Sequence, residues 1–201
     1  VVYDDRGIMT AAPYQVVVGT GTLFPAAKSL ATAQAGDGIS LTLVVVEADE
    51  FDRSFLHLNP DFSAIMSMDA DHLDIYGDKD QMAIGFTQFA GRLKKNGKVF
   101  LKYGLKLNEK NDAVEVFGLE NGTYQSKNVR VVDGFFVFDF KSPIQNIEKI
   151  KFTLPGHHNV ENATAAISIA QQLGVKGDAV IKAMASFKGI KRRFEFIVKT
   201  D

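Results

Sequence analysis

Residues 41–50 read Leu-Thr-Leu-Val-Val-Val-Glu-Ala-Asp-Glu, and this stretch decides the class of fold. A continuous apolar run such as Leu41–Val46 is typical of a strand covered on both faces, as in parallel sheets. The run ends abruptly in acid at Glu47, and a second run, Ala64–Met68, ends in the polar stretch 69–72. Two successive units of strand, polar tip and crossover predict an α/β fold, with a mostly parallel sheet flanked by helices.

Further segments extend this parallel core. We expect a β-branched strand at Gln15–Val18, followed by a turn at Gly19-Thr20-Gly21-Thr22. The Ala-rich stretch Phe24–Gln34 favours a helix. A third strand is expected at Val99–Lys102. Before it, Asp78 can cap a helix over residues 79–95, in which four large apolar residues share one face: Met82, Phe86, Phe89 and Leu93.

The middle of the chain changes character. Short alternating strands are expected at 113–117, 128–132 and 135–140, and Asp133-Gly134 between the last two is a two-residue hairpin signal. These strands predict a small antiparallel β insert over about residues 105–155. Helices then resume at Asn159–Leu173, closed by Gly174, and at 177–187. No linker is evident, so residues 1–201 are predicted to form one domain.

The composition excludes several classes of function. The chain has 201 residues, of which 46% are hydrophobic, and its formal net charge of −1 provides no overall positive field for nucleic acid. It has no cysteine, which excludes disulfides, thiolate metal sites and cysteine nucleophiles. No apolar run could span a bilayer and no signal peptide is visible, so we expect a cytoplasmic protein without nucleic-acid or membrane partners.

Two acidic clusters follow the buried strands. Glu47-Ala48-Asp49-Glu50 and Asp69-Ala70-Asp71-His72 both lie where a strand ends, which is the edge at which open α/β sheets bind ligands. Carboxylates there suit magnesium, and an imidazole among carboxylates suits a cation or proton transfer. The structural alternatives are a solvated acidic loop for the first cluster and a helix-capping run for the second.

Two later clusters combine polar and basic side chains. In Gly156–Ala163, His158 and Asn162 are four residues apart and share a helix face, where an amide can pair with an adenine edge and an imidazole can stack. The adjacent Arg192 and Arg193 offer bidentate donors for phosphate or carboxylate. Taken alone, each cluster is better explained by its structural alternative, a capped helix start for the first and a basic surface pair for the second.

In this order and spacing, the clusters resemble the Mur ligase family. The resemblance rests on residues 47–55 (Glu-Ala-Asp-Glu-Phe-Asp-Arg-Ser-Phe), 71–76 (Asp-His-Leu-Asp-Ile-Tyr), 156–166 and 187–194, and runs from about residue 44 to 201. It implies the central, ATP-binding domain of such a ligase, with a P-loop-like sheet. The similarity is greatest to the branch that joins L-alanine to UDP-N-acetylmuramate, and a branch that attaches a recovered tripeptide is the alternative.

The resemblance also implies a reaction and a magnesium site. The family uses ATP to turn the muramoyl carboxylate into an acyl phosphate, which the amine attacks. Glu47 and His72 would hold magnesium, although hard cations prefer oxygen to an imidazole nitrogen. Arg193, with Arg192, would meet the phosphates where charge develops, so His72 and Arg193 are the expected catalytic residues.

The nucleotide contacts implied by the resemblance lie in two places. His158 and Asn162 would contact adenine, with Asn159 setting up the start of their helix. The turn Gly19-Thr20-Gly21-Thr22 would lie at the phosphates, but it departs from the family pattern Gly-Thr-x-Gly-Lys-Thr because it has no lysine. Residues 1–40 are therefore atypical, and the phosphate loop is altered or missing.

Two further departures concern a modified lysine and the extent of the chain. Thr87 and Gln88 occupy the expected position of the lysine that some family members modify to support a second magnesium, so no modified lysine is expected. The nucleotide-sugar domain and the carboxy-terminal domain of the family have no counterpart here. Three hypotheses follow: a ligase domain inactive on its own, a weak nucleotide-binding module, or a scaffold that no longer binds ATP.

Overall fold

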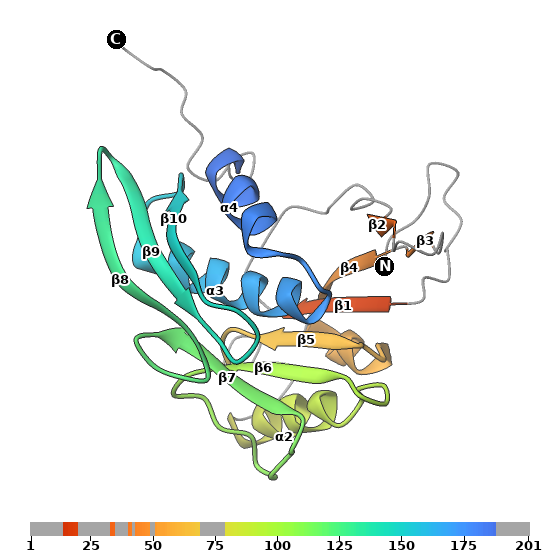
Figure 1. Ribbon diagram of the computed structural model, residues 1–201. Coiled ribbons are helices and arrows are strands. Elements are labelled where there is room, and N and C mark those ends of the chain that lie inside the picture. Colours follow the sequence, from red (N-terminus) through yellow and green to blue (C-terminus); the bar gives the residue numbers. More distant parts are fainter. Residues whose placement is uncertain are drawn as a thin grey trace. The chain divides into compact units, whose positions relative to one another are not determined.

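The computed structural model describes residues 14–19, 33–34, 40–41, 43–48, 51–68 and 79–187 (Figure 1). The chain divides into two compact units, which we describe separately. Unit 1 comprises Val1–Thr22 and Ala26–Glu115, and unit 2 comprises Leu23–Pro25 and Val116–Asp201. The prediction of one domain over residues 1–201 stays a prediction.

Unit 1 contains the parallel part of the fold. Its four parallel strands lie in the order β4-β1-β5-β6, with β1 at Tyr14–Gly19, β4 at Leu43–Ala48, β5 at Phe62–Ile65 and β6 at Lys98–Lys102. The predicted parallel α/β core is confirmed. Strand β5 begins and ends earlier than the apolar run 64–68 suggested, because its ladder with Lys98–Leu101 starts at Phe62.

A short antiparallel pair corrects one prediction. β2 (Ala33–Gln34) pairs with β3 (Ser40–Leu41), so the end of the predicted helix Phe24–Gln34 is extended instead. The hydrogen bonds of this pairing override the helix propensity of the Ala-rich stretch. Residues 24–32 lie outside the described part, so the rest of that helix stays a prediction.

The core of unit 1 is built on the predicted apolar helix face. Helix α2 (Lys79–Ala90) buries Met82, Phe86 and Phe89, which are 1%, 4% and 1% exposed. They pack with Phe55 of the 3-10 helix η1 (Phe51–His57), whose ring centroid lies 5.5 Å from that of Phe86 and 5.1 Å from that of Phe89. The helix ends at Ala90 rather than at residue 95.

A tertiary contact explains why α2 is shorter than predicted. The backbone N–H of Lys94 donates to the carbonyl of Pro60 at 2.9 Å, and its ammonium lies 3.0 Å from a carboxylate oxygen of Asp61. These bonds hold the chain away from a helical path after Gly91.

Unit 2 contains the predicted β insert and the last two helices. Its sheet has the order β10-β9-β8-β7, with β7 at Val114–Leu119, β8 at Tyr124–Val132, β9 at Phe135–Lys141 and β10 at Ile147–Phe152. β8 and β9 are antiparallel, as predicted, and β10 pairs antiparallel with β9 although no strand was expected there. The first two residues of β7 belong to unit 1. The predicted turn Asp133-Gly134 joins β8 to β9, with φ of 49° and 76°.

The β7–β8 pairing is parallel, so the expectation of a wholly antiparallel insert was wrong at this point. Glu120 and Gly122 both have positive φ, 59° and 96°. The N–H of Thr123 reaches back to the carbonyl of Val116, and that of Glu120 reaches forward to Ser126. This tight loop brings the chain back alongside β7, so that β8 runs beside β7 in the same direction.

Two helices cover the side of this sheet that carries its buried residues. α3 (His157–Gln172) contacts β8, and α4 (Gly177–Ser186) contacts β10, close to the predicted bounds of both helices. The covered strand residues include Tyr124, Phe138, Phe140, Ile150 and Phe152, all at most 2% exposed. Gly174, with φ of 78°, ends α3 as predicted.

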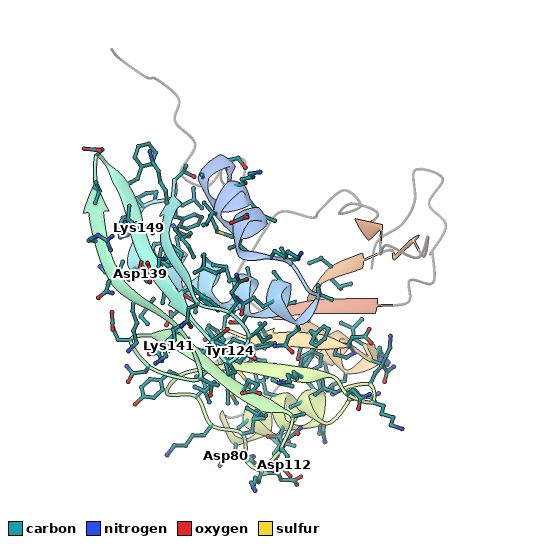
Figure 2. All side chains as sticks on the ribbon, viewed as in Figure 1. Asp80, Asp112, Tyr124, Asp139, Lys141 and Lys149 are labelled. Atoms are coloured by element: carbon teal, nitrogen blue, oxygen red, sulfur yellow. The ribbon has the colours of Figure 1, made fainter. Side chains whose placement is uncertain are left out.

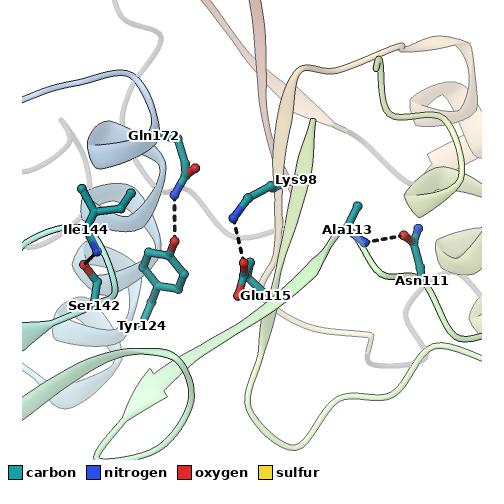
Figure 3. A network of polar contacts seen from close by, with 8 residues as sticks. All are labelled: Lys98, Asn111, Ala113, Glu115, Tyr124, Ser142, Ile144 and Gln172. Carbon is teal, nitrogen blue, oxygen red and sulfur yellow. Dashed lines mark hydrogen bonds and ion pairs between the residues drawn. The ribbon is translucent and has the colours of Figure 1, made fainter. Parts of the chain in front are cut away.

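Polar bonds fix α3 against its sheet. The hydroxyls of Ser126 and Thr164 lie 2.6 Å apart although both residues are fully buried. The amide of Gln172 donates to the hydroxyl of buried Tyr124 at 2.8 Å (Figure 3). Because a buried hydroxyl needs a partner, these bonds favour one position of the helix along the strand.

Candidate functional site

The carboxyl ends of three parallel strands meet at one edge of unit 1. In the β1–β4 ladder Gly19 lies beside Ala48 and Val18 beside Glu47, and in the β1–β5 ladder Val18 lies beside Ala64. The chain crosses from β1 to β4 on one side and then to β5 on the other. Ligands bind at such a reversal of strand order, outside the carboxyl ends.

This edge brings together two of the predicted sites. Gly19, the first residue of the predicted phosphate turn, ends β1, and Glu47, a predicted magnesium ligand, lies in the adjacent strand one residue before its end. The neighbouring backbones fit the predicted arrangement of phosphate and metal. The carboxylate of Glu47 is itself outside the described side chains.

Several predicted site residues lie outside the described residues. They are Thr20, Gly21, Thr22, His72, Arg192 and Arg193. Their roles stay predictions. Among the side chains that the structure describes, no group of three or more His, Asp or Glu residues is placed to hold a metal ion.

The predicted adenine-binding residues lie at the start of α3. Gly156 precedes the helix with φ of 100°, a conformation that favours glycine, and a Cβ there would also displace the exposed His158 ring, which lies within 2.6 Å. Asn159 donates its side-chain N–H to the carbonyl of Pro155 at 2.6 Å, while its backbone N–H donates to Gly156. Asn159 thus fixes the chain where it enters the helix, and its role in nucleotide binding stays a prediction.

His158 and Asn162 share one side of α3, one turn apart. The imidazole of His158 is exposed and Asn162 is half-buried, so this side of the helix presents a ring and an amide near solvent. Adenine offers a face for stacking and an edge for paired hydrogen bonds. The arrangement is therefore chemically suited to the ligand that the sequence predicted.

Sequence reasoning missed the support beneath this helix start. The His157 ring packs edge-on against Phe136 of β9, with centroids 5.7 Å apart. About two turns further on, Thr164 donates to the carbonyl of Val160 at 2.8 Å and contacts the hydroxyl of Ser126. Small hydroxyl residues within an apolar helix face were the available signal.

The expected position of a modified lysine has a structural role here. The hydroxyl of Thr87 donates to the carbonyl of Ala83 at 2.8 Å and accepts the N–H of Asn108 at 3.0 Å. Thr87 thereby connects α2 to the loop after β6, while Gln88 is exposed. The absence of a modified lysine stays a prediction.

The family is decided by comparison of the whole sequence. The model of the Mur ligase middle domain matches residues 25–170, well over half of the chain. The chain belongs to the Mur ligase family. The resemblance expected from four short motifs is confirmed, and so are the fold class and the ligase family.

Two similar curated proteins have the same name, which is that of a Mur ligase. The UDP-N-acetylmuramate–L-alanine ligase of Christiangramia forsetii is 46% identical over 159 residues, which cover 79% of this chain and 34% of that protein. The ligase of the same name from Flavobacterium johnsoniae is 45% identical over 164 residues, covering 82% and 36%. The chain thus spans about a third of the length of the relatives it matches.

Solved structures agree on the fold. The UDP-N-acetylmuramate–alanine ligase MurC of Thermotoga maritima matches with a TM-score of 0.72 at 23% identity, covering 93% of this chain and 48% of that one. MurF from the same organism, solved in complex with ADP, matches with a TM-score of 0.68 at 16% identity, covering 92% and 50%. At these identities the likeness shows the Mur ligase fold alone.

Proposed function

We propose that this chain is the central, ATP-binding domain of a ligase that joins L-alanine to UDP-N-acetylmuramate. The observation that carries the proposal is the 46% identity to a ligase of that name over 79% of the chain. Relatives at 37–45% identity in five further genera have the same name, which favours the alanine-adding over the tripeptide-adding branch. An ADP complex of a protein with the same fold supports a nucleotide as ligand.

The proposed contacts of this chain are with the adenine and with the phosphates of the nucleotide. His158 and Asn162 of α3 stack on and pair with the adenine, and Asn159 holds the start of that helix. The turn that begins at Gly19 offers backbone N–H groups to the phosphates. Arg192 and Arg193 stabilise the charge that develops during phosphoryl transfer.

Magnesium is the expected metal of this site, and Glu47 fits it. The metal would neutralise phosphate charge, and a carboxylate at the end of a strand beside the phosphate turn supplies the hard oxygen that it prefers. His72 is the second proposed ligand. Its nitrogen is the weaker match to a hard cation.

Because the lysine is missing, the affinity for nucleotide is the quantity that separates a nucleotide-binding domain from a scaffold without a ligand. A P-loop lysine reaches the terminal phosphates, and the stretch Gly19-Thr20-Gly21-Thr22-Leu23 has none. We therefore expect weak binding of ATP with magnesium, governed by the adenine contacts. We also propose the cytoplasmic location that was expected from the sequence.

Calorimetric titration of the chain with ATP and magnesium chloride tests this function. We expect binding with a dissociation constant near the millimolar range, and Asn162→Ala should weaken it about tenfold or more, because two directed hydrogen bonds to the base are lost. Asn108→Ala is the matched control, since Asn108 is exposed on a loop of unit 1 and should leave affinity unchanged. Silence at millimolar ATP would instead favour a scaffold that has lost its ligand.

A further inference from the structure

The outer side of the unit 2 sheet carries a concentration of positive charge. The ladders place Arg130 beside Val137 and Val137 beside Lys151, and they place Lys127 beside Asp139. Directly paired residues point to the same side of a sheet, and alternate residues of a strand share that side, so Lys141 joins them. On the opposite side, Phe138 and Phe140 are fully buried.

A fifth cation lies beside the same strand. The backbone N–H of Lys149, at a bulge of β10, donates to a carboxylate oxygen of Asp139 at 2.8 Å. Figure 2 shows Asp139, Lys141 and Lys149 on these neighbouring strands. We call Lys127, Arg130, Lys141, Lys149 and Lys151 the basic face; the first is half-buried and the other four are exposed.

The five cations of the basic face exceed the negative charge that Asp139 places among them. Asp139 is the carboxylate among these cations, and its oxygens are bonded to Asn128 and to the backbone of Lys149. In the part of the chain that the structure describes, none of the five cations is in an ion pair. The chain as a whole has a net charge of −1, so this positive surface is a local feature.

The basic face leads to an apolar hairpin tip. Val131 and Val132 at the end of β8 are 63% and 43% exposed, and they directly follow Arg130. Val131 pairs with Phe136 and Val132 with Phe135, so the two valines lie on opposite sides of the ribbon. The end of the β8–β9 hairpin therefore has one exposed valine on each side, and the ammonium of Lys151 lies 3.6 Å from the centre of the Phe135 ring beside Val132.

The basic face and the exposed valines of the hairpin tip together favour one kind of partner. An acidic protein segment would complement the cations but would offer nothing in particular to the exposed valines. The surface of an anionic bilayer presents negative headgroups directly above an apolar layer, and basic segments with apolar side chains bind there. Asp133, in the turn, limits the tip to headgroup depth.

We propose that the basic face and the β8–β9 hairpin tip bind reversibly to anionic lipid surfaces. This interaction is independent of the proposed ligase function. It would replace the expectation of no membrane partner, which rested on the lack of a spanning segment and of a visible signal peptide. Each cation near an anionic surface strengthens binding about fivefold, so the face supports weak binding that salt reverses.

Cosedimentation of the 201-residue chain with vesicles tests the proposal. We expect binding to vesicles of phosphatidylglycerol and phosphatidylcholine at low salt, with little binding to phosphatidylcholine alone. Lys141→Gln combined with Lys151→Gln should weaken binding about 25-fold at two lost cations. Val131→Ser combined with Val132→Ser should weaken it as well, while leaving its salt dependence unchanged.

A matched pair of lysines provides the control. Lys176→Gln with Lys182→Gln removes the same charge from exposed positions at α4 instead of the strands, and should change binding less than twofold. Circular dichroism of each variant checks that the fold is retained. Three outcomes would overturn the proposal. The first two are an equal loss of vesicle binding in both lysine pairs and equal binding to neutral and anionic vesicles. The third is binding to polyglutamate but not to vesicles, with no effect of the valine substitutions.

Discussion

The buried hydroxyl of Ser63 affects the stability of the fold. Ser63 lies in β5, it is fully buried, and its hydroxyl has no hydrogen-bond partner in the described part of the chain. Its neighbours on the same side, Ile65 and Val99, belong to the apolar core of unit 1. Burying a hydroxyl without a partner costs about 1–3 kcal/mol.

We therefore expect Ser63→Ala to raise the free energy of unfolding by about 1 kcal/mol. Chemical denaturation monitored by circular dichroism measures this change. Ser126→Ala is the counterpart, since Ser126 is equally buried but its hydroxyl contacts Thr164, and it should lower the stability by a similar amount. A loss of stability in both variants would show that Ser63 has a bond of its own.

Asp139 makes the stability of unit 2 depend on pH. The backbone N–H of Lys149, the side chain of Asn128 and the charges of Arg130 and Lys149 together lower the pKa of its carboxyl. A carboxyl whose pKa is lower in the folded than in the unfolded chain stabilises the fold above the unfolded pKa, which is about 3.9. That stabilisation is lost as the pH falls from there through the folded value.

Asp139→Asn tests this dependence. The variant should be less stable than the parent at pH 7, and the difference should shrink as the pH is lowered below about 4, where the parent carboxyl becomes protonated. Urea unfolding of both proteins from pH 7 to pH 3 measures the two curves. Parallel curves over this range would exclude the proposed contribution of the carboxylate.

At the scale of elements, the β8–β9 hairpin depends on its turn. Asp133 and Gly134 both have positive φ, and a Cβ at Gly134 would meet nothing within 4 Å. Gly134→Ala therefore changes only backbone strain, and should reduce stability by about 1–2 kcal/mol. Asp133→Asn, which suits the same turn, should be nearly neutral. Equal thermal melting temperatures for Gly134→Ala and the parent would contradict this account.

Elements whose pattern is local could be predicted from the sequence. The helical spacing of Met82, Phe86 and Phe89 predicted the buried face of α2, and that of His158 and Asn162 predicted their common side of α3. The meeting of Gly19 and Glu47 at one sheet edge followed from the parallel strands. The side chains at that edge could be assigned roles only through the family.

The missed elements depend on conformations that the residue pattern does not encode. Strand β10 was overlooked because its buried residues are Ile147, Ile150 and Phe152, and the bulge at Lys149 breaks the alternation that marks a strand. The parallel direction of β8 depends on positive φ at Glu120, a residue type that seldom adopts it.

At the scale of the whole molecule, the chain covers 34% of the Christiangramia forsetii ligase. Ligation requires the nucleotide, the acid and the amine to be held together in reacting geometry. We expect this 201-residue chain alone to release no phosphate above background from ATP with UDP-N-acetylmuramate and L-alanine. The full ligase of Flavobacterium johnsoniae is the positive control, and turnover proportional to the concentration of this chain would refute the expectation.

The bond between Gln172 and Tyr124 has a practical consequence for spectroscopy. The chain contains no tryptophan and five tyrosines, so its near-ultraviolet signal comes from tyrosine. Tyr124 is 1% exposed and hydrogen-bonded, whereas Tyr103 is 57% exposed. The part of the tyrosine absorbance change that Tyr124→Phe removes will therefore report the packing of α3 on β8, and a single introduced tryptophan would be measured without any background from other tryptophans.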